Sequence, residues 1–190
     1  MKRIFPFLFL GVVLLFTACQ DDDDGPQPQP TDDLLAYDGD NNTGPLLDAG
    51  NYEAAVLFPA NIIQDYTGRK LNAVTFFIGE LPANCEVRVY EGTTNDGRPS
   101  NLIFASDVTN GLVAPSWNRL FLDPPITLAE DDIWLSIALT HNQQQQSIGC
   151  DAGPNQANGD WLYDNSDGEW ITYIQRTQES VNWNIRGELE

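Results

Sequence analysis

The feature of this sequence that most constrains its fold is a strict alternation of side-chain character over Asp132 to Thr140. One set of alternate positions holds Ile133, Leu135, Ile137 and Leu139, and the other holds Trp134, Ser136, Ala138 and Thr140. Because successive side chains of a strand point to opposite faces, this pattern predicts a strand with one face in the core. The same period of two recurs over Trp117 to Leu122 and over Trp183 to Leu189.

Short apolar segments bounded by turn-forming residues predict further strands. They are Tyr52 to Phe58, Leu71 to Ile78, Glu86 to Tyr90, Leu102 to Asp107, Gln146 to Cys150, Trp161 to Tyr163 and Trp170 to Ile174. The turn-rich segment 164–168 predicts a hairpin between the last two. One short helix is expected over Ala60 to Tyr66, after Pro59 and ending at Gly68. About ten strands with at most one short helix predict an all-β antiparallel sandwich, with a jelly roll as the first choice.

The N-terminus has the pattern of an export signal. Met1-Lys2-Arg3 is basic, and Ile4 to Phe16 is an apolar run too short to span a bilayer. The segment Leu15-Phe16-Thr17-Ala18-Cys19 resembles a bacterial lipobox, which implies a signal peptide over residues 1–18 and a lipid on the thiol of Cys19. The alternative is an ordinary signal peptide whose cleavage point happens to lie at Cys19.

The acidic residues Asp21 to Asp24, directly after Cys19, resemble the export signal of surface lipoproteins of Bacteroidota. The resemblance implies an outer-membrane protein that is lipid-anchored and faces outward. The alternative is a charged tether that leaves the protein on the periplasmic face. Gly25 to Asp33 is rich in Pro and Gln and indicates an extended spacer. The expected organisation is therefore a tether over residues 19–33 and one β-sandwich domain over residues 34–190.

Charge excludes one class of partner. The chain has 28 Asp and Glu residues against 9 Lys and Arg residues, a formal net charge of −19. Such a charge repels phosphate, and no basic run is present, so nucleic-acid binding is not expected. The abundance of aromatic residues excludes disorder throughout the chain.

Several segments within residues 50–190 resemble the β-sandwich modules found beside secreted peptidases and in adhesins of Bacteroidota, broadly of the gingipain-adhesin type. These segments are Ala54 to Pro59, Tyr66 to Gly68, Trp117 with Leu120 to Leu122, Ile133 to Leu135, Asp151 to Pro154 and Asn182 to Arg186. The resemblance rests on strand and turn patterns, and it implies a binding module of larger assemblies without an assigned reaction.

Two cysteines lie within the expected domain. Cys85 and Cys150 are predicted to form a disulfide, because the domain is expected outside the cytoplasm. The alternative is two separately buried thiols. The single histidine, His141, follows a strand and is expected to face solvent in a loop. No residue pattern around it is typical of a nucleophilic site.

Calcium is the candidate cofactor. Asp38, Asp40 and Asn42 offer side-chain oxygens at alternate positions, as a hard cation requires. The spacing does not match an EF-hand, since Thr43 stands where that loop needs Gly. A second oxygen-rich segment lies at 164–167. The alternative for both segments is that Asp, Asn and Gly serve as turn formers.

Aromatic residues form the candidate ligand site. Trp161, Tyr163 and Trp170 lie around a polar hairpin, and Trp or Tyr rings stack on the apolar faces of sugars while nearby amides and carboxylates bond the hydroxyls. Trp161 and Tyr163 share a strand face, whereas Trp170 and Tyr173 fall on opposite faces.

These observations favour a non-catalytic cell-surface module with adhesin-like recognition of a glycan or a protein. A second hypothesis is a structural accessory subunit of an outer-membrane complex. A third is a glycoside hydrolase that uses two carboxyl groups about 5–9.5 Å apart.

Overall fold

The computed structural model describes residues 33–190, which fold into two antiparallel β-sheets packed face to face. The predicted signal peptide, Cys19 and nearly all of the predicted tether lie outside the described residues. Asp33 is described, and β1 begins at the next residue. Neither helix within residues 33–190 has the length and apolar character of a membrane span.

The smaller sheet has four strands in the order β1-β10-β3-β6. Their bounds are Leu34–Leu35 for β1, Ile185–Leu189 for β10, Lys70–Ile78 for β3 and Ser116–Thr127 for β6. The larger sheet has six strands in the order β5-β4-β7-β2-β8-β9. Their bounds are Pro99–Asp107 for β5, Asn84–Thr93 for β4, Ile133–His141 for β7, Gly50–Phe58 for β2, Trp161–Asp164 for β8 and Glu169–Thr172 for β9.

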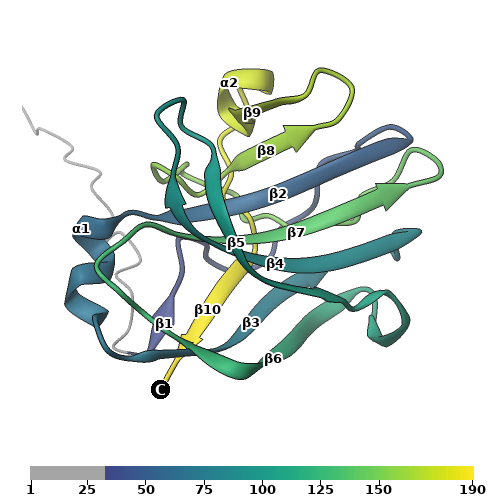
Figure 1. The fold of residues 1–190 in the computed structure, drawn as a ribbon. Helices are drawn as coiled ribbons and strands as arrows, with labels where there is room; N and C mark the ends of the chain where they lie inside the picture. The colour runs from purple at the N-terminus through teal and green to yellow at the C-terminus, as the bar shows by residue number, and fades with distance from the viewer. Residues whose placement is uncertain (1–32) are drawn as a thin grey trace, which may run out of the picture.

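The strand order confirms the all-β sandwich and has the topology of a jelly roll. The sheet β1-β10-β3-β6 faces the quartet β2-β7-β4-β5, and the chain passes between the two sheets as the two Greek keys of that fold require. The hairpin β8–β9 is an addition, inserted between β7 and β10, that extends the larger sheet at the β2 edge. Figure 1 shows this hairpin and the short helix α2 beyond β2, on the side of the sheet away from β4.

The alternating side chains of β7 lie on the two faces that the sequence predicted. Ile133, Leu135, Ile137 and Leu139 enter the main hydrophobic core, where they meet residues of both sheets. Trp134 and its alternate neighbours point to the opposite side, the outer face of the six-stranded sheet. Only the first set lies between the two sheets, which fixes the register of the strand; Trp134 and Ser136 on the other face are also buried, beneath outer-face side chains.

One predicted strand is absent and one strand was not predicted, so the number of strands agrees. Residues 146–150 form only isolated bridges, through Ile148 to Ile78 and through Cys150 to Thr43 and Trp183. A segment that bonds to several different partners cannot join a continuous ladder. The short strand β1 was not predicted, because two residues carry no readable period.

Several boundaries also differ. The strand predicted over Trp170 to Ile174 ends at Thr172, and a helical turn that the sequence did not predict, α2 (Tyr173–Thr177), follows. Strand β6 continues through Pro124 and Pro125, which is compatible with its place at a sheet edge.

The predicted helix is present as α1 (Ala60–Ile63) followed by a 3-10 turn, η1 (Gln64–Tyr66). The segment ends at Tyr66, and Gly68, two residues later, has a φ of +85°, a conformation that glycine adopts without strain. A second 3-10 turn, η2 (Thr109–Gly111), lies between β5 and β6.

Candidate functional site

The predicted aromatic residues lie on the outer face of the six-stranded sheet. Strand register places six side chains in one line across all six strands, which we call the cross-strand row. From β5 to β9 it consists of Asp107, Glu86, Ala138, Glu53, Tyr163 and Trp170. Neighbouring strands lie about 4.8 Å apart, so the row is about 24 Å long. One end of it is acidic and the other is aromatic.

The rows on either side of it differ in character. One row is polar and joins Asn84, Thr140 and Asn51. The other runs from Arg88 through Ser136 and Ala55 to Trp161. The outer face therefore combines hydrogen-bonding groups with aromatic rings over a distance that suits an extended ligand.

The aromatic end is a connected cluster. Tyr163 and Trp170 have ring centroids 5.6 Å apart, and Trp134 lies 5.4 Å from Trp161 and 5.8 Å from Trp170. Trp134 is fully buried beneath its neighbours, and its indole Nε1 donates a hydrogen bond to Thr93 Oγ1 at 2.9 Å. Trp161, Tyr163 and Trp170 are only partly buried. The three predicted ligand-binding residues are thus held together by packing while parts of their rings face solvent.

Glu53 is the polar centre of the face. Its side chain is 7% exposed, and its Oε2 accepts a 2.7 Å bond from Arg88 Nη1. Its Oε1 accepts bonds from the hydroxyls of Tyr90 and Ser136. Arg88 also donates through Nε to Glu86, so one guanidinium joins two carboxylates. Three donors around one carboxylate make a rigid centre, since the buried charge is partnered on every side.

Protonation states in this centre follow from its contacts. Burial raises the pKa of Tyr90, and the neighbouring Glu53 carboxylate raises it further, so the phenol remains a donor. Burial lowers the pKa of Arg88, but its bonds to Glu86 and its proximity to Glu53 outweigh that effect, and the pKa is raised overall. The guanidinium therefore stays charged.

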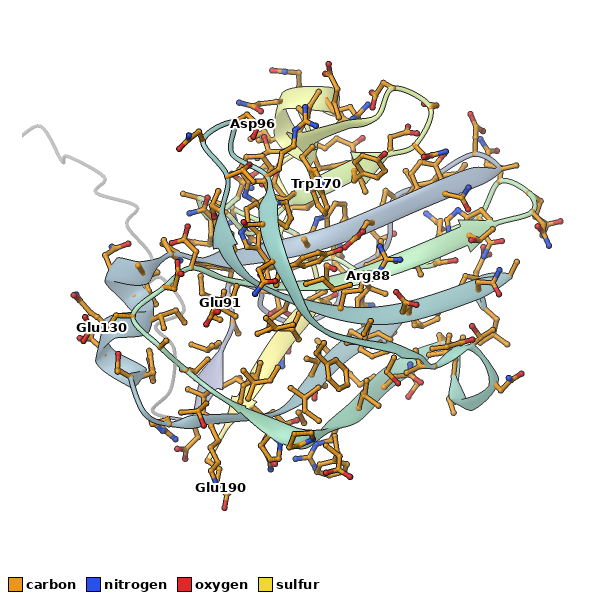
Figure 2. The ribbon with its side chains drawn as sticks, viewed as in Figure 1. Arg88, Glu91, Asp96, Glu130, Trp170 and Glu190 are labelled. Atoms are coloured by element: carbon orange, nitrogen blue, oxygen red, sulfur yellow. The ribbon has the colours of Figure 1, made fainter. Side chains whose placement is uncertain are left out.

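Two adjoining hollows lie over this centre. One, of about 290 Å³, is lined by residues that include Asn51, Glu53 and Tyr163. The other, of about 260 Å³, is lined by residues that include Asn84, Glu86 and Asp107. Both are lined by Arg88, Ala138 and Thr140. We call the combined depression the outer-face groove. Figure 2 shows Arg88 and Trp170 projecting from the six-stranded sheet.

A larger hollow, of about 410 Å³, lies elsewhere, where β5 and β6 form the open edges of the two sheets. It is lined by core residues such as Phe76 and Leu120 and by the loop that contains η2. Two exposed apolar side chains, Leu102 on β5 and Phe121 on β6, come from the same strands. None of the predicted ligand-binding residues reaches this hollow.

The predicted calcium residues are not equivalent. The Asp38 side chain is fully buried, and its carboxylate accepts hydrogen bonds from Asn184 Nδ2 at 2.6 Å and from Arg186. Burial raises the pKa of Asp38, and Arg186 and Asn184 oppose that rise. Asp40 and Asn42 are exposed. Within residues 33–190, no three His, Cys, Asp or Glu side chains gather as a metal site would need. A cation here would compete with Arg186 for Asp38, and the calcium site stays a prediction.

The second oxygen-rich segment has the character of a turn. Asp164 Oδ1 accepts a bond from the amide of Ser166, and Asp167 Oδ1 accepts one from the amide of Glu169. Asp167 also pairs with Arg176 at 2.6 Å. These carboxylates stabilise the β8–β9 hairpin, as the alternative interpretation expected.

The predicted disulfide is absent. Cys85 and Cys150 are both free thiols in the hydrophobic core. Cys85 lies in β4 opposite Leu139 of β7, whereas Cys150 bridges to Thr43 and Trp183 beside the smaller sheet. Each thiol is therefore held by different backbone partners, and burial raises the pKa of each to about 12.

The solvent-facing position expected for His141 is also wrong. The residue is the last of β7, is 2% exposed and packs against Tyr52 with ring centroids 5.4 Å apart. Burial lowers the pKa of its imidazole. A strand that ends under a loop, instead of in solvent, accounts for the difference.

Sequence reasoning missed the polar half of the groove. Glu53 lies in an otherwise apolar segment, Tyr52 to Phe58, and a charged residue at the outward position of a central strand is a readable signal. Arg88 alternates with the apolar residues Val87 and Val89 in the same way. The pairing of these two residues across β7 could not be read, because it depends on strand order.

Comparisons with known proteins identify the fold and no family. No protein-family model and no curated protein matches the sequence. A solved structure of a clostridial cysteine protease, Cwp84, after propeptide cleavage is similar with a TM-score of 0.57 and 13% identity, over 85% of this chain and 41% of that chain. A structure of the cysteine protease and lectin-like domains of Cwp84, a surface layer associated protein of Clostridium difficile, has a TM-score of 0.49 and 12% identity, over 80% and 36%. This chain thus spans about two fifths of these neighbours, and the likeness to the first is one of fold.

Proposed function

We propose that this chain is a non-catalytic cell-surface binding module that recognises a glycan through the outer-face groove. The observation that carries the proposal is the single line of side chains from Trp170 and Tyr163 to Glu86 and Asp107. Aromatic faces suit the apolar side of a sugar ring, and fixed carboxylates and amides suit its hydroxyls. The small side chain of Ala138 leaves room for a ligand between the two ends.

The expected mechanism is recognition on a pre-formed surface. Glu53, Arg88 and Tyr90 are already bonded to one another, so little ordering is needed when a ligand arrives. Asn51 and Thr140, which bond each other at 2.9 Å, present further polar atoms at the rim of the groove. A shallow site with many polar atoms is suited to modest affinity and to several contacts along a chain of sugars.

The test is a glycan array with the full chain, followed by calorimetry on the best ligand. Trp170→Ala is expected to weaken binding about tenfold or more, because exposed aromatic anchors dominate such surfaces. The matched control is Phe121→Ala, which removes an exposed ring from the four-stranded sheet. Absence of any glycan ligand, or equal losses in the two variants, would contradict the proposal.

Location and calcium are parts of the same proposal with tests of their own. A lipid on Cys19 would display the domain outside the cell, and Cys19→Ala is expected to release the protein from the membrane fraction. Calcium at Asp38, Asp40 and Asn42 would make glycan affinity fall in EDTA. Unchanged affinity in EDTA would remove calcium from the proposal without affecting the groove.

A structural accessory role is the second candidate, and one observation favours it. The open β5–β6 side combines the hollow of about 410 Å³ with exposed Leu102 and Phe121, and apolar surface of this kind is common where proteins dock. Cross-linking in intact cells tests it. A stoichiometric protein partner that contacts Phe121, with no glycan bound at Trp170, would favour docking over glycan recognition.

A further inference from the structure

The charge of the outer-face groove differs between its two ends, and this difference bears on which sugars it can bind. Its acidic end contains Glu86 and Asp107, and Glu53 lies in the middle of the cross-strand row. Arg88 is the cationic side chain among the residues that line the groove, and it is bonded to both Glu53 and Glu86. The groove therefore has three carboxylates and one guanidinium, which pairs with two of them, and its net charge is negative.

The excess negative charge lies at one end. Asp107 makes no ion pair with Arg88, and its Oδ1 accepts a 2.9 Å bond from the amide of Thr109. The hydroxyl and the amide of Thr109 lower the pKa of Asp107, so the carboxylate stays ionised in neutral and mildly acidic solution. Glu86 is 36% exposed at its side chain and can turn one oxygen to a ligand. The opposite end, at Tyr163, continues along the cross-strand row to Trp170 and offers rings instead of charges.

The donors and acceptors of the acidic end are unequal in number. Carboxylates only accept hydrogen bonds, and several of the donor groups of Arg88 are already used. A ligand group placed there must therefore donate, as hydroxyl and ammonium groups do. A carboxylate or sulfate on the ligand would face like charges within the range where repulsion in low salt is strong.

Resting on the proposed function, we infer that the outer-face groove binds a linear oligosaccharide across the strands, with an apolar sugar face on Tyr163 and Trp170 and a neutral or amino sugar at Glu86 and Asp107. Acidic sugars are excluded from the second position. Glu86 and Asp107 are then the residues that determine specificity, and Trp170 and Tyr163 supply affinity that does not depend on charge.

Three probes with the same β-1,4-linked gluco backbone test this inference, namely hexamers of glucosamine, glucose and glucuronic acid. Calorimetry with the full chain, in a mildly acidic buffer that keeps the amines charged and the carboxylates ionised, is expected to rank glucosamine first and glucuronic acid last. High salt is expected to reduce the differences while the glucose hexamer binds as before.

The paired variant Glu86→Gln with Asp107→Asn is expected to weaken glucosamine binding roughly two- to twentyfold, as loss of two exposed charge pairs would. Affinity for the glucose hexamer is expected to change by less than about twofold, since hydroxyls bond amides as well as carboxylates. The matched control is Glu130→Gln, which removes a charge between β6 and β7. Figure 2 shows Glu130 at the α1 end of the molecule, away from Arg88. Thermal melting checks that all variants fold.

The outcomes separate the two proposals. If glucuronic acid binds as tightly as glucosamine, or if the paired variant leaves the affinity for glucosamine unchanged, the inference is wrong and glycan recognition stands. If the paired variant weakens all three probes equally, the carboxylates hold the ligand without selecting it, and the inference is wrong again. If none of the three probes and no glycan of the array binds, the proposed function fails and takes the inference with it.

Discussion

The two outer faces of the sandwich both carry aromatic rings, but they use them differently. On the four-stranded sheet, the guanidinium of Arg186 lies 4.2 Å from the ring centroid of Trp117, and that of Arg119 lies 4.3 Å from the centroid of Phe121. Phe77 meets Trp117 edge-on. The rings of Trp117 and Phe121 are thus covered by cations that are in turn paired with carboxylates.

On the six-stranded sheet the rings contact one another and not cations. Trp161, Tyr163 and Trp170 meet their neighbours at tilted angles, and none of the arginine–aromatic stacks found within residues 33–190 involves them. A sugar can stack only on a ring face that no side chain already covers. The number of aromatic residues on a face is therefore a poor guide to binding, and the availability of their faces is a better one.

The largest effect that would test this contrast is on stability. Trp134→Ala is expected to lower the free energy of unfolding by about 3–5 kcal/mol, because the buried indole supports Trp161 and Trp170. Trp117→Ala, on the other face, is expected to lower it by about half as much, because that ring is only partly buried. Urea unfolding measures both. Equal losses would mean that the aromatic cluster of the larger sheet is no better packed than the arginine-covered rings.

A pair of glutamates extends the comparison to charge. Glu53→Gln is expected to lower the free energy of unfolding by about 2 kcal/mol, since Arg88 and the buried hydroxyl of Ser136 would lose a charged acceptor. Glu188 on the four-stranded sheet bonds Arg119 and Thr75, but its side chain is 27% exposed. Its change to Gln is expected to have an effect below about 1 kcal/mol. If Glu188→Gln lowers the free energy of unfolding more than Glu53→Gln does, the carboxylate that matters more for stability lies on the four-stranded sheet.

The sequence predicted most of the fold because the fold depends on local periodicity. The alternation over β7 predicted both its strand state and its two faces, and the turn residues predicted the β8–β9 hairpin. The strand prediction over residues 146–150 was wrong because an apolar segment without a continuous partner strand does not form a strand. The strand prediction was also wrong at residues 173 and 174, because Tyr173, the first residue of α2, is buried as the end of a strand would be.

The site was predictable only in part, for a reason that is also physical. Trp161 and Tyr163 are two residues apart on one strand, so their common face follows from the sequence. Glu53, Arg88 and Ala138 come from three strands that are far apart in the chain. Their meeting depends on the order β4-β7-β2, which no local pattern encodes. The same long-range order gives Cys85 and Cys150 different backbone partners.

A smaller effect is expected from pH, and it arises beside the groove, at the end of β7. Burial lowers the folded-state pKa of His141 below its ordinary value near 6.5. The unfolded chain then binds the proton more readily, so stability contributed by the neutral imidazole is present above about pH 6.5 and is lost as pH falls towards the folded pKa. The raised pKa of Asp38 acts with the opposite sign, since its protonated form favours the folded state.

His141→Phe separates these contributions, because Phe fills a similar volume against Tyr52 and does not titrate. The variant is expected to lose less stability than the parent protein when pH is lowered from about 7.5 to about 5.5. Urea midpoints at the two pH values measure this. An unchanged difference between the two midpoints would mean that groups other than His141, on either face, set the pH dependence.

The smallest effect is expected at the two buried thiols, which lie beside different sheets. Cys85 and Cys150 are buried, and with pKa values raised to about 12 they are expected not to react with a thiol reagent in the folded protein. In a Cys19→Ala chain unfolded without reductant, both thiols are expected to react. If neither reacts until reductant is added, the two residues are bonded after all. That result would contradict the free thiols of the structure, in which Cys85 pairs with Leu139 in the sheet and Cys150 bridges to Trp183.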